Sequence, residues 1–384
     1  MVAPDSSLTV ELKRTPLHAL HLRRGGRMTP FAGYEMPVQY ADGIIKEHRH
    51  TRAAASLFDV SHMGQIALRP RSGNLLDAAR ALERLVPGDI LGLSVGRQRY
   101  TMFTNGAGGV LDDFIVSNLG DHLRLVVNAS RKVEDEVHLR RHLSDGCLIE
   151  PLSDCALIAL QGPKAEPAVL ALAPEIRSMA FMDVRALTLR GESCVISRSG
   201  YTGEDGFEIS VLAQAAEALC EALLRGAEVA LAGLGARDGL RLEAGLCLYG
   251  SDLDETTTPV EAALEWTIAR VRRVGGERMG GFPGAEKILH QLANGAARRR
   301  VGLRPEGRTP VRGSTPLFRE QTDNNPIGTV TSGGFAISLN APAAMGYVPS
   351  ALAALGSRLF AEVRGKRHEV VVSTLPFVPA RHKH

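Results

Sequence analysis

The sequence predicts an α+β protein that ends in a small antiparallel β-barrel or sandwich. Through the first three quarters of the 384 residues, stretches with helical periodicity alternate with stretches of strand periodicity. After about Arg300 the pattern changes to short β-type runs that Gly or Pro interrupts every few residues. A helix-like segment over 283–294, followed by Gly295 and three arginines, separates the two patterns. Because one hydrophobic core rarely serves a chain this long, we expect two or three domains with ligand clefts between them.

The expected elements follow this alternation in order. Apolar residues at helical spacing predict helices over 44–57, 75–85, 131–143, 213–224 and 236–246. Alternating or β-branched runs predict strands over 62–68, 99–104, 114–116, 123–127, 156–160, 187–189, 194–197 and 206–211. Beyond residue 300 the one helical stretch that we expect is 350–355, which leaves enough short strands for a barrel.

The composition is that of an ordinary globular protein, with 44% hydrophobic and 23% charged residues. A net charge of +3 and one short basic run, 298–300, are too little to predict a nucleic-acid partner. Residues 1–15 contain no apolar run of signal-peptide length, and no segment approaches the length of a membrane-spanning helix. We therefore expect a cytoplasmic protein with no membrane partner.

Cysteine and histidine spacing predicts neither a disulfide framework nor a metal site. The five cysteines are odd in number and widely spaced, so we expect buried thiols. His48 and His50 lack further ligands nearby and more often mark a solvated helix face. The glycine-rich segment 233–239 has Asp238 where a dinucleotide fingerprint needs its third glycine, which disfavours a nicotinamide cofactor.

Two adjacent carboxylates, Asp112 and Asp113, open a strand directly after the glycine-rich turn 105–109. A strand directs neighbouring side chains to opposite faces, so only one of the two can point into a given cavity. The other would brace the turn, and aspartate is common in turns for that reason alone. The residues by themselves leave this choice open and favour two turn residues.

A second carboxylate lies on the strand that follows the segment 200–206. Alternation places Phe207, Ile209 and Val211 on an apolar face and Glu208 with Ser210 on the other. That polar face is either solvated or lines a cavity. Arg237 begins a predicted helix and has the same two interpretations, a surface charge or a group that recognises a carboxylate or carbonyl.

Several blocks together resemble the aminomethyltransferase (glycine cleavage T protein) family. Among them are Gly108-Gly-Val-Leu-Asp112-Asp113 and Gly200-Tyr-Thr-Gly-Glu-Asp-Gly-Phe-Glu208. The other blocks, in chain order, are 15–18, 31–40, 58–63, 237–250, 254–261, 329–333, 344–348 and 376–379. The resemblance implies a three-domain cloverleaf of antiparallel sheets around a central folate cavity. It divides the chain into a folate-binding region over 9–297, made of two α+β lobes, and a C-terminal β-barrel over 298–384.

The resemblance also implies a reaction. An aminomethyl group carried on the dihydrolipoyl arm of the H protein would be split. Its methylene would pass to tetrahydrofolate and its nitrogen would leave as ammonia. The implied partners are the lipoylated H protein and a folate, with no metal.

Position by position, the family pattern implies a catalytic role for Asp112, beside the folate nitrogens. It implies that Glu208 holds the pterin, since a carboxylate can accept two adjacent N–H groups. Further pocket positions match Met63, Tyr100, Tyr201 and Arg237. The chain departs from the pattern at its end, where His382 stands in place of the expected tyrosine.

Other classes remain as alternatives. A folate-dependent demethylase of a small methylated amine would use a similar cavity. A non-transferase factor for iron–sulfur assembly or tRNA modification would carry a Lys-Gly-Cys block, whereas this chain reads Glu243-Ala-Gly-Leu-Cys247. In a non-catalytic binding module, Asp112 and Glu208 would be solvated surface charges.

Overall fold

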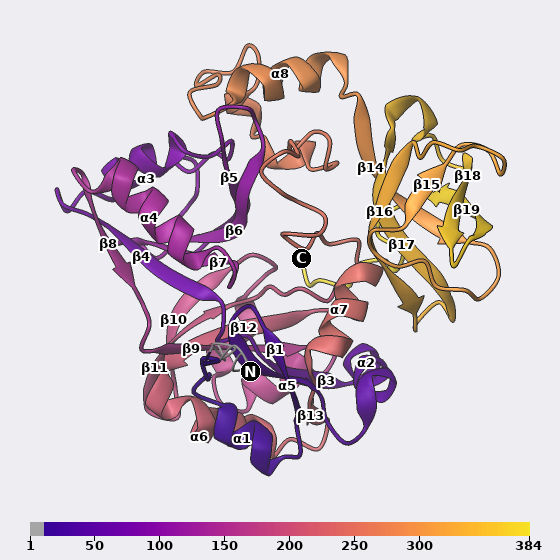
Figure 1. The fold of residues 1–384 in the computed structure, drawn as a ribbon. Helices are drawn as coiled ribbons and strands as arrows, with labels where there is room; N and C mark the ends of the chain where they lie inside the picture. Colours follow the sequence, from indigo (N-terminus) through magenta and orange to yellow (C-terminus); the bar gives the residue numbers. More distant parts are fainter. Residues whose placement is uncertain (1–10) are drawn as a thin grey trace, which may run out of the picture.

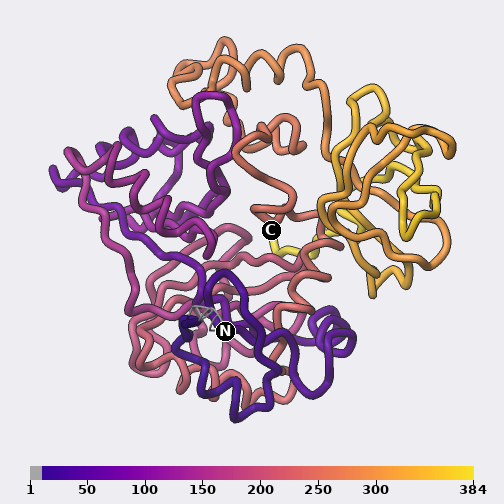
Figure 2. Tube along the Cα trace, viewed as in Figure 1, coloured from indigo at the N-terminus to yellow at the C-terminus, as the bar shows by residue number. Residues whose placement is uncertain are grey.

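A computed structural model describes residues 11–384 of the protein. Three lobes surround a centre near which the chain also ends (Figure 1). The trace in Figure 2 shows the last residues, in yellow, running back from the C-terminal lobe to this centre. The expected start of the first region at residue 9 lies outside the described residues.

One lobe is a five-stranded antiparallel sheet in the order β5-β6-β7-β4-β8, covered by α3 and α4. Its strands are β4 (Gly64–Pro70), β5 (Gln98–Thr104), β6 (Val110–Asn118), β7 (Leu123–Val127) and β8 (Cys147–Pro151). Its helices are α3 (Leu75–Glu83) and α4 (Lys132–Leu143). Phe103, Phe114 and Leu125 are buried in the core between sheet and helices.

A second lobe is built on a six-stranded sheet in the order β10-β11-β12-β9-β3-β13, antiparallel except for the β3–β13 pair. Its strands are β3 (Ala55–Asp59), β9 (Cys155–Gln161), β10 (Val184–Leu189), β11 (Glu192–Ser197), β12 (Gly206–Leu212) and β13 (Val229–Leu231). Around it lie α1 (His18–Arg23), α2 (Gly43–Ala53), α5 (Ala165–Leu170), α6 (Ala213–Leu223), α7 (Leu234–Glu243), the 3-10 helix η1 (Pro174–Ser178) and the hairpin β1 (Arg27–Phe31) and β2 (Tyr34–Gln39).

The third lobe is a closed six-stranded barrel in the order β14-β17-β16-β15-β18-β19. Its strands are β14 (Arg298–Pro305), β15 (Pro316–Phe318), β16 (Gly328–Ala336), β17 (Ala341–Pro349), β18 (Arg358–Val363) and β19 (Lys366–Ser373). Closure leaves no free sheet edge, and small and β-branched side chains fill the interior. The expected helix over 350–355 is only a 3-10 turn, η4 (Ser350–Leu352).

The segment between α7 and the barrel has little regular structure. It contains the short 3-10 helices η2 (Glu265–Thr267) and η3 (Arg270–Arg272) and then α8 (Ala285–Asn294). The predicted α+β class with a C-terminal β-barrel is confirmed.

The expected helix over 44–57 was wrong in its second part. Helix α2 ends at Ala53, and the following residues form strand β3 between β9 and β13. Every residue of β3 is buried. A short apolar run does not distinguish helix from buried strand by periodicity, and pairing with two neighbouring strands decides the outcome here.

Candidate functional site

Strand β12 presents Glu208 on the face opposite its core. Phe207 and Ile209 are fully buried in the hydrophobic core of the second lobe, as their alternation predicted. Glu208 points the other way and keeps part of its surface accessible. Burial raises the pKa of Glu208, and the positive charge of Arg237 and a hydrogen bond from Ser199 partly oppose that rise. The strand therefore holds a carboxylate inside the molecule with one arginine near it.

Arg237 comes from the first turn of α7 and lies between Glu208 and Tyr201. Its guanidinium carbon is 4.8 Å from the centre of the Tyr201 ring, a cation–π arrangement. Burial lowers the pKa of Arg237, and the charge of Glu208 partly restores it. Within residues 11–384 its Nη1 is buried and has no hydrogen-bond partner. A buried donor of this kind is available to an acceptor on a ligand.

The two carboxylates of strand β6 point to opposite faces, as the sequence predicts. Asp112 shares a face with Phe114 and Val116, which are buried in the lobe core. Asp113 shares the other face with Ile115 and lies diagonally across from Tyr100 on β5. The Tyr100 hydroxyl donates a hydrogen bond to Asp113 Oδ2 at 2.8 Å.

Asp113 belongs to the same cluster as Tyr201. Burial, and then the charge of Asp112, raise the pKa of Asp113 to about 7. The charge of Asp113 in turn contributes to raising the pKa of Tyr201 and of Cys247. The Tyr201 hydroxyl donates to the carbonyl of Cys247, which ties the loop after α7 to this cluster.

Asp112 lies behind the strand, away from this cluster. Asn128 donates to it from its backbone N–H, at 3.1 Å from Oδ2, and from its side-chain Nδ2, at 2.8 Å from Oδ1. Its carboxyl group also lies close to that of Asp135 on α4, and each affects the pKa of the other. The structure thus brings Glu208, Arg237, Tyr201 and Tyr100 together with Asp113, and places the predicted catalytic residue, Asp112, on the other face of β6.

The burial of the central cluster indicates an enclosed hollow between its side chains. Burial has the largest effect on the pKa of Tyr100, Asp113, Tyr201, Glu208 and Arg237. All five side chains nevertheless keep part of their surface accessible. Groups that protein surrounds on most sides, and that water can still reach, face an internal space rather than bulk solvent. This arrangement suits a flat ligand with a few polar edges.

Trp266 borders the cluster from η2. Its indole ring stacks on the Tyr100 ring at a centroid distance of 5.5 Å and an interplanar angle of 25°. The indole is 65% exposed, so one side of the stacked pair faces outward. Sequence patterns did not indicate this residue, because the segment around it has no strong periodicity.

The remaining predicted pocket residues differ in position. Met63 is partly exposed and packs against the small core that contains Ala236, the neighbour of Arg237. This packing places it beside α7, the helix that carries Arg237. His382 stacks on Phe181 at 4.0 Å, and burial lowers its pKa. Its contacts fasten the C-terminal tail to the second lobe, and they lie outside the group around Tyr201.

Sequence reasoning also missed Asp113 and Asn128. For Asp113 a signal was present, since Asp112, Phe114 and Val116 alternate on one face and leave Asp113 on the other. Choosing between the two faces requires knowing that Tyr100 lies across the ladder. Asn128 gave no signal, because it follows a strand as an ordinary polar residue.

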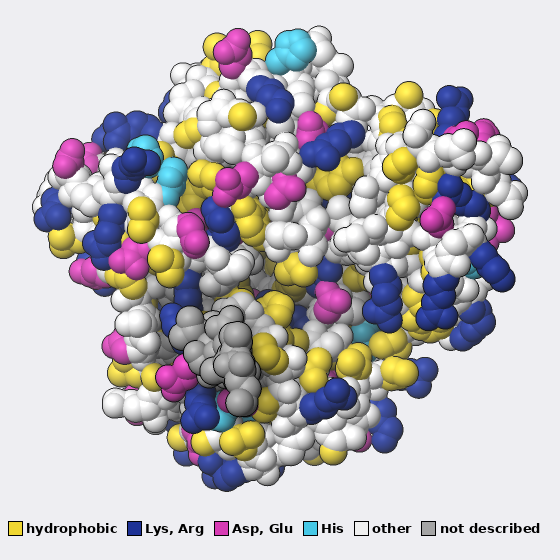
Figure 3. All heavy atoms as spheres, viewed as in Figure 1, with side chains coloured by type: hydrophobic (Ala, Val, Ile, Leu, Met, Phe, Trp, Pro, Cys, Tyr) yellow, Lys and Arg dark blue, Asp and Glu magenta, His cyan; other side chains and the backbone are white. Residues whose placement is uncertain are grey.

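Among residues 11–384, neither a cluster of metal ligands nor a strongly charged surface patch indicates a second functional site. Across residues 11–384, the structure contains no group of three or more His, Cys, Asp or Glu that could hold a metal ion. His48 contacts Glu243, whereas His50 contacts the carbonyl of Ala55. Acidic and basic side chains are interspersed on the face seen in Figure 3, in keeping with a net charge of +3. No helix among the described residues is long and apolar enough to cross a membrane.

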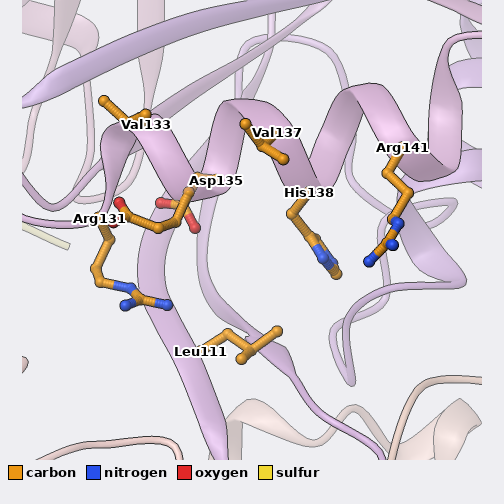
Figure 4. A pocket seen from close by; sticks show the side chains of 8 residues that line it. Leu111, Arg131, Val133, Asp135, Val137, His138 and Arg141 are labelled. Carbon is orange, nitrogen blue, oxygen red and sulfur yellow. The ribbon is translucent and has the colours of Figure 1, made fainter.

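Two cavities lie elsewhere. One, of about 300 Å³, runs along α4 and is closed on its other side by Leu111 of β6 (Figure 4). The other, of about 390 Å³, lies between the 251–261 segment and the barrel. Neither includes Glu208 or Asp113.

The fold and the site together define a class: a three-lobed α+β protein with a C-terminal barrel and an enclosed, carboxylate-lined centre. Two family models match the chain. The GCVT N-terminal domain matches residues 17–272, and the glycine cleavage T-protein C-terminal barrel domain matches residues 298–379. The second match begins at the first residue of β14.

The chain is similar to several aminomethyltransferases. The chain is 45% identical over 388 residues to the mitochondrial aminomethyltransferase of Mus musculus, covering 99% of this chain and 93% of that protein. It is 44% identical over 382 residues to that of Flaveria trinervia, covering 97% and 91%. The crystal structure of the glycine cleavage system aminomethyltransferase T from Bartonella henselae superposes with a TM-score of 0.88 at 41% identity, covering 97% and 100%. The chain belongs to the aminomethyltransferase (glycine cleavage T protein) family.

Proposed function

We propose that this protein transfers the methylene of an aminomethyl group, carried on the dihydrolipoyl arm of an H protein, to tetrahydrofolate. As a member of its family, the chain is an enzyme that transfers a one-carbon unit within the glycine cleavage system. The tetrahydrofolate acceptor, the H protein partner and a cytoplasmic location are parts of the proposal. The observation that carries it is the enclosed group of Glu208, Arg237, Tyr201, Tyr100 and Asp113.

The chemistry of that group fits a reduced pterin. An ionised Glu208 offers two acceptor oxygens to the adjacent N–H donors of a 2-amino-4-oxopyrimidine ring. Arg237 balances its charge and keeps one donor free for an acceptor on the ligand. The aromatic faces of Tyr100 and Tyr201, with Met63 at the border, would enclose a flat ring. In this assignment Glu208 binds the pterin edge, as the sequence analysis expected.

For the reacting end we assign Asp113, in place of Asp112, as the catalytic carboxylate. A pKa near 7 lets one group both accept and return a proton at neutral pH. It would take a proton from an attacking folate nitrogen and deliver it to the leaving amine. Two folate N–H bonds and the C–S and C–N bonds of the donor break, two new N–C bonds form, and the free thiol and ammonia each gain a proton. As an anion it would also stabilise the cationic iminium-like intermediate.

A direct assay tests the transfer itself. H protein loaded with the aminomethyl group is mixed with tetrahydrofolate and this protein, and both ammonia and 5,10-methylenetetrahydrofolate are measured. We expect the two products in equal amounts. Sarcosine and dimethylglycine serve as alternative donors. Methylenetetrahydrofolate formed from either of them, with none from the H protein, would overturn the proposal in favour of a demethylase.

The two aspartates of β6 provide a matched pair of variants. We expect Asp113→Asn to lower kcat by roughly 100-fold or more, the usual contribution of a general acid–base group. The affinity for tetrahydrofolate should remain nearly unchanged. Asp112→Asn should lower kcat much less than Asp113→Asn does, because the Asp112 carboxyl group does not face the hollow. The opposite ranking would return the catalytic role to Asp112.

A further inference from the structure

A pair of buried carboxyl groups lies directly behind the proposed catalytic strand. Asp112 is fully buried and Asp135 is 2% exposed. They come from different elements, β6 and α4, and their carboxyl groups lie close enough together for a hydrogen bond between them. Two carboxylates cannot form that bond unless one of them is protonated, because an ionised carboxylate has no donor. The pair therefore holds one proton and one negative charge.

Burial, charge and hydrogen-bond donors around the two carboxyl groups indicate that Asp135 holds the proton. Burial, followed by the charge of Asp112, raises the pKa of Asp135 to about 10. Burial also raises the pKa of Asp112, but the hydrogen bond from Asp135 and two from Asn128 oppose that rise. Three donors, one from Asp135 and two from Asn128, would stabilise an ionised Asp112. A neutral Asp135 needs no such donors, so the negative charge resides on Asp112. A carboxyl pair of this kind titrates as a unit.

Asn128 connects this pair to the front of the strand. Its Nδ2 donates to Asp112 Oδ1 at 2.8 Å and to Asp113 Oδ1 at 2.9 Å. The other oxygen of Asp113 accepts the Tyr100 hydroxyl. Both oxygens of Asp113 are thus fixed, one of them by an amide whose orientation depends on the charge on Asp112.

The pair also has its own opening to solvent. Asp135 lines the cavity of about 300 Å³ shown in Figure 4, where it projects from α4 with Arg131 and His138. Its Oδ2 is buried and has no hydrogen-bond partner within the described residues. The cavity is large enough to admit a small carboxylic acid next to Asp135.

We propose that Asp135 is a positioning residue for the reaction: by sharing one proton with Asp112 it keeps that residue charged, and through Asn128 this charge holds Asp113 ready for proton transfer. The inference rests on the proposed role of Asp113. Asp135 touches no substrate in this scheme. It determines the pH at which Asp113 takes up its proton, and leaves the identity of the reacting group unchanged.

Other charged or titratable groups also face these carboxyls. Asp113 is faced by Tyr100 from β5 and by Tyr201 and Cys247 from the loops beside β12 and α7. The pair is faced by Tyr249, and by Arg131 and Glu134 beside Asp135. Burial raises the pKa of the tyrosines and of Cys247 above neutrality, so they stay uncharged between pH 5 and 9. Arg131 keeps its charge over that range, as arginine does. The group expected to titrate near pH 7 is Asp113.

The test is a pH titration of the full-length protein carrying carbon-13 at the aspartate carboxyl carbons, combined with the pH dependence of transfer. In the unmodified protein we expect one aspartate signal, absent from Asp113→Asn, to titrate near pH 7. Asp112→Asn removes the neighbouring negative charge and should move that titration about one pH unit lower. Asp135→Ala should move it the same way, because a buried Asp112 without its donor takes up a proton.

Chemical rescue separates positioning from general damage. In Asp135→Ala, added formate should return the Asp113 titration toward its original value, since formic acid can enter through the cavity and replace the lost carboxyl group. Glu136→Gln removes a charge from the exposed side of the same helix, where Glu136 pairs with Arg140, and should leave the titration unchanged.

An unchanged Asp113 signal in both Asp112→Asn and Asp135→Ala would overturn the inference, as would a shift that formate does not reverse. The NMR titration needs no substrate. A protein that shows the expected shifts but transfers no methylene would refute the proposed function and leave the inference standing. If both variants unfold, Asp135→Asn provides a further check, because its amide still donates to Asp112 and should keep the titration near its original pH.

Discussion

Glu208 shows how one strand position can hold a charge inside a protein. Its neighbours Phe207 and Ile209 anchor the strand in a core that is 0% exposed at both positions, so the carboxylate cannot turn away from the hollow. Burial makes the ionised form costly, and the charge of Arg237 offsets part of that cost. A ligand that donates hydrogen bonds to Glu208 would offset more of it.

We expect Glu208→Ala to weaken tetrahydrofolate binding by about 2–3 kcal/mol, or roughly 30- to 150-fold in Kd, because the two ligand donors would be buried without an acceptor. Isothermal titration calorimetry under anaerobic conditions measures the change. Glu192→Ala, at the β10–β11 turn of the same sheet, is the control and should bind normally. Equal affinities in the two variants would exclude Glu208 from the pterin site.

The sequence predicts that Asp112 and Asp113 diverge, but it does not predict which of them faces the hollow. Alternation along β6 establishes that they diverge, and this expectation is confirmed. Which face meets the hollow depends on the pairing of β6 with β5, where Tyr100 is placed beside Asp113. Strand register is a tertiary property, and the family resemblance was matched to the neighbouring residue.

At the scale of elements, the turn between β5 and β6 determines where both aspartates lie. Gly109 contacts the 254–257 segment so closely that an added Cβ would lie 1.8 Å from the carbonyl oxygen of Glu255. Val110, the next residue, donates its N–H to the carbonyls of Asp254 and Thr257. The glycine is therefore required for the close approach of two segments that are far apart in the chain.

We accordingly expect Gly109→Ala to lower the free energy of unfolding by about 1–3 kcal/mol, the usual cost of forced overpacking, and to reduce kcat by displacing β6. Denaturant titration and the transfer assay measure the two effects. Gly106→Ala is the matched control in the same turn, since an added Cβ there meets nothing within 4 Å. Equal effects of the two substitutions would show that the contact with the 254–257 segment is unimportant.

The elements were largely predictable, for reasons that differ by region. Strands β9 and β12 alternate or are uniformly apolar, so periodicity located them, and α6 has a clear apolar stripe. Strand β3 was missed because it follows α2 almost directly, with no Gly or Pro between them, and only pairing with β9 and β13 makes its residues extended. The polar face of α4 gave no hint that Asp135 is buried against β6.

At the scale of the whole molecule, Glu243 joins the second lobe to the barrel. It accepts hydrogen bonds from Arg52 of α2 at 2.8 Å and from the Ser338 hydroxyl, in the β16–β17 turn, at 2.6 Å. His48 lies 3.0 Å away. Burial alone would raise the pKa of Glu243, but the hydrogen bonds and charge of His48 and the bonds from Ser338 lower it to about 2.

This network predicts sensitivity to acid. Because the folded pKa of Glu243 is below its ordinary value of 4.5, the stabilisation is fully present above pH 4.5 and is lost as the pH falls toward 2. The shift corresponds to about 3 kcal/mol. Free energies of unfolding measured between pH 7 and 2.5 should therefore fall less steeply in Glu243→Gln than in the unmodified protein. The control is Glu362→Gln, which removes an exposed ion pair with Arg367 in the barrel and should follow the pH dependence of the unmodified protein. The same pH dependence in Glu243→Gln would contradict the prediction.

The overall architecture was easier to predict than the assembly of the site. The change in sequence pattern near Arg300 is sufficient to place a β-rich lobe at the end of the chain, and the closed barrel confirms it. The meeting of Glu208 from β12, Arg237 from α7 and Asp113 from β6 depends on how two lobes face each other. Local patterns carry no information about that arrangement.

Trp266 is the one tryptophan in the chain, and its ring lies against Tyr100 at the edge of the hollow. Excitation at the long-wavelength edge of protein absorption therefore selects a single indole. Its fluorescence originates beside the site. Any molecule that enters next to Tyr100 changes the polarity and quenching that this indole experiences. The protein thus carries a built-in fluorescent reporter of occupancy, and binding can be followed in real time without attaching a dye.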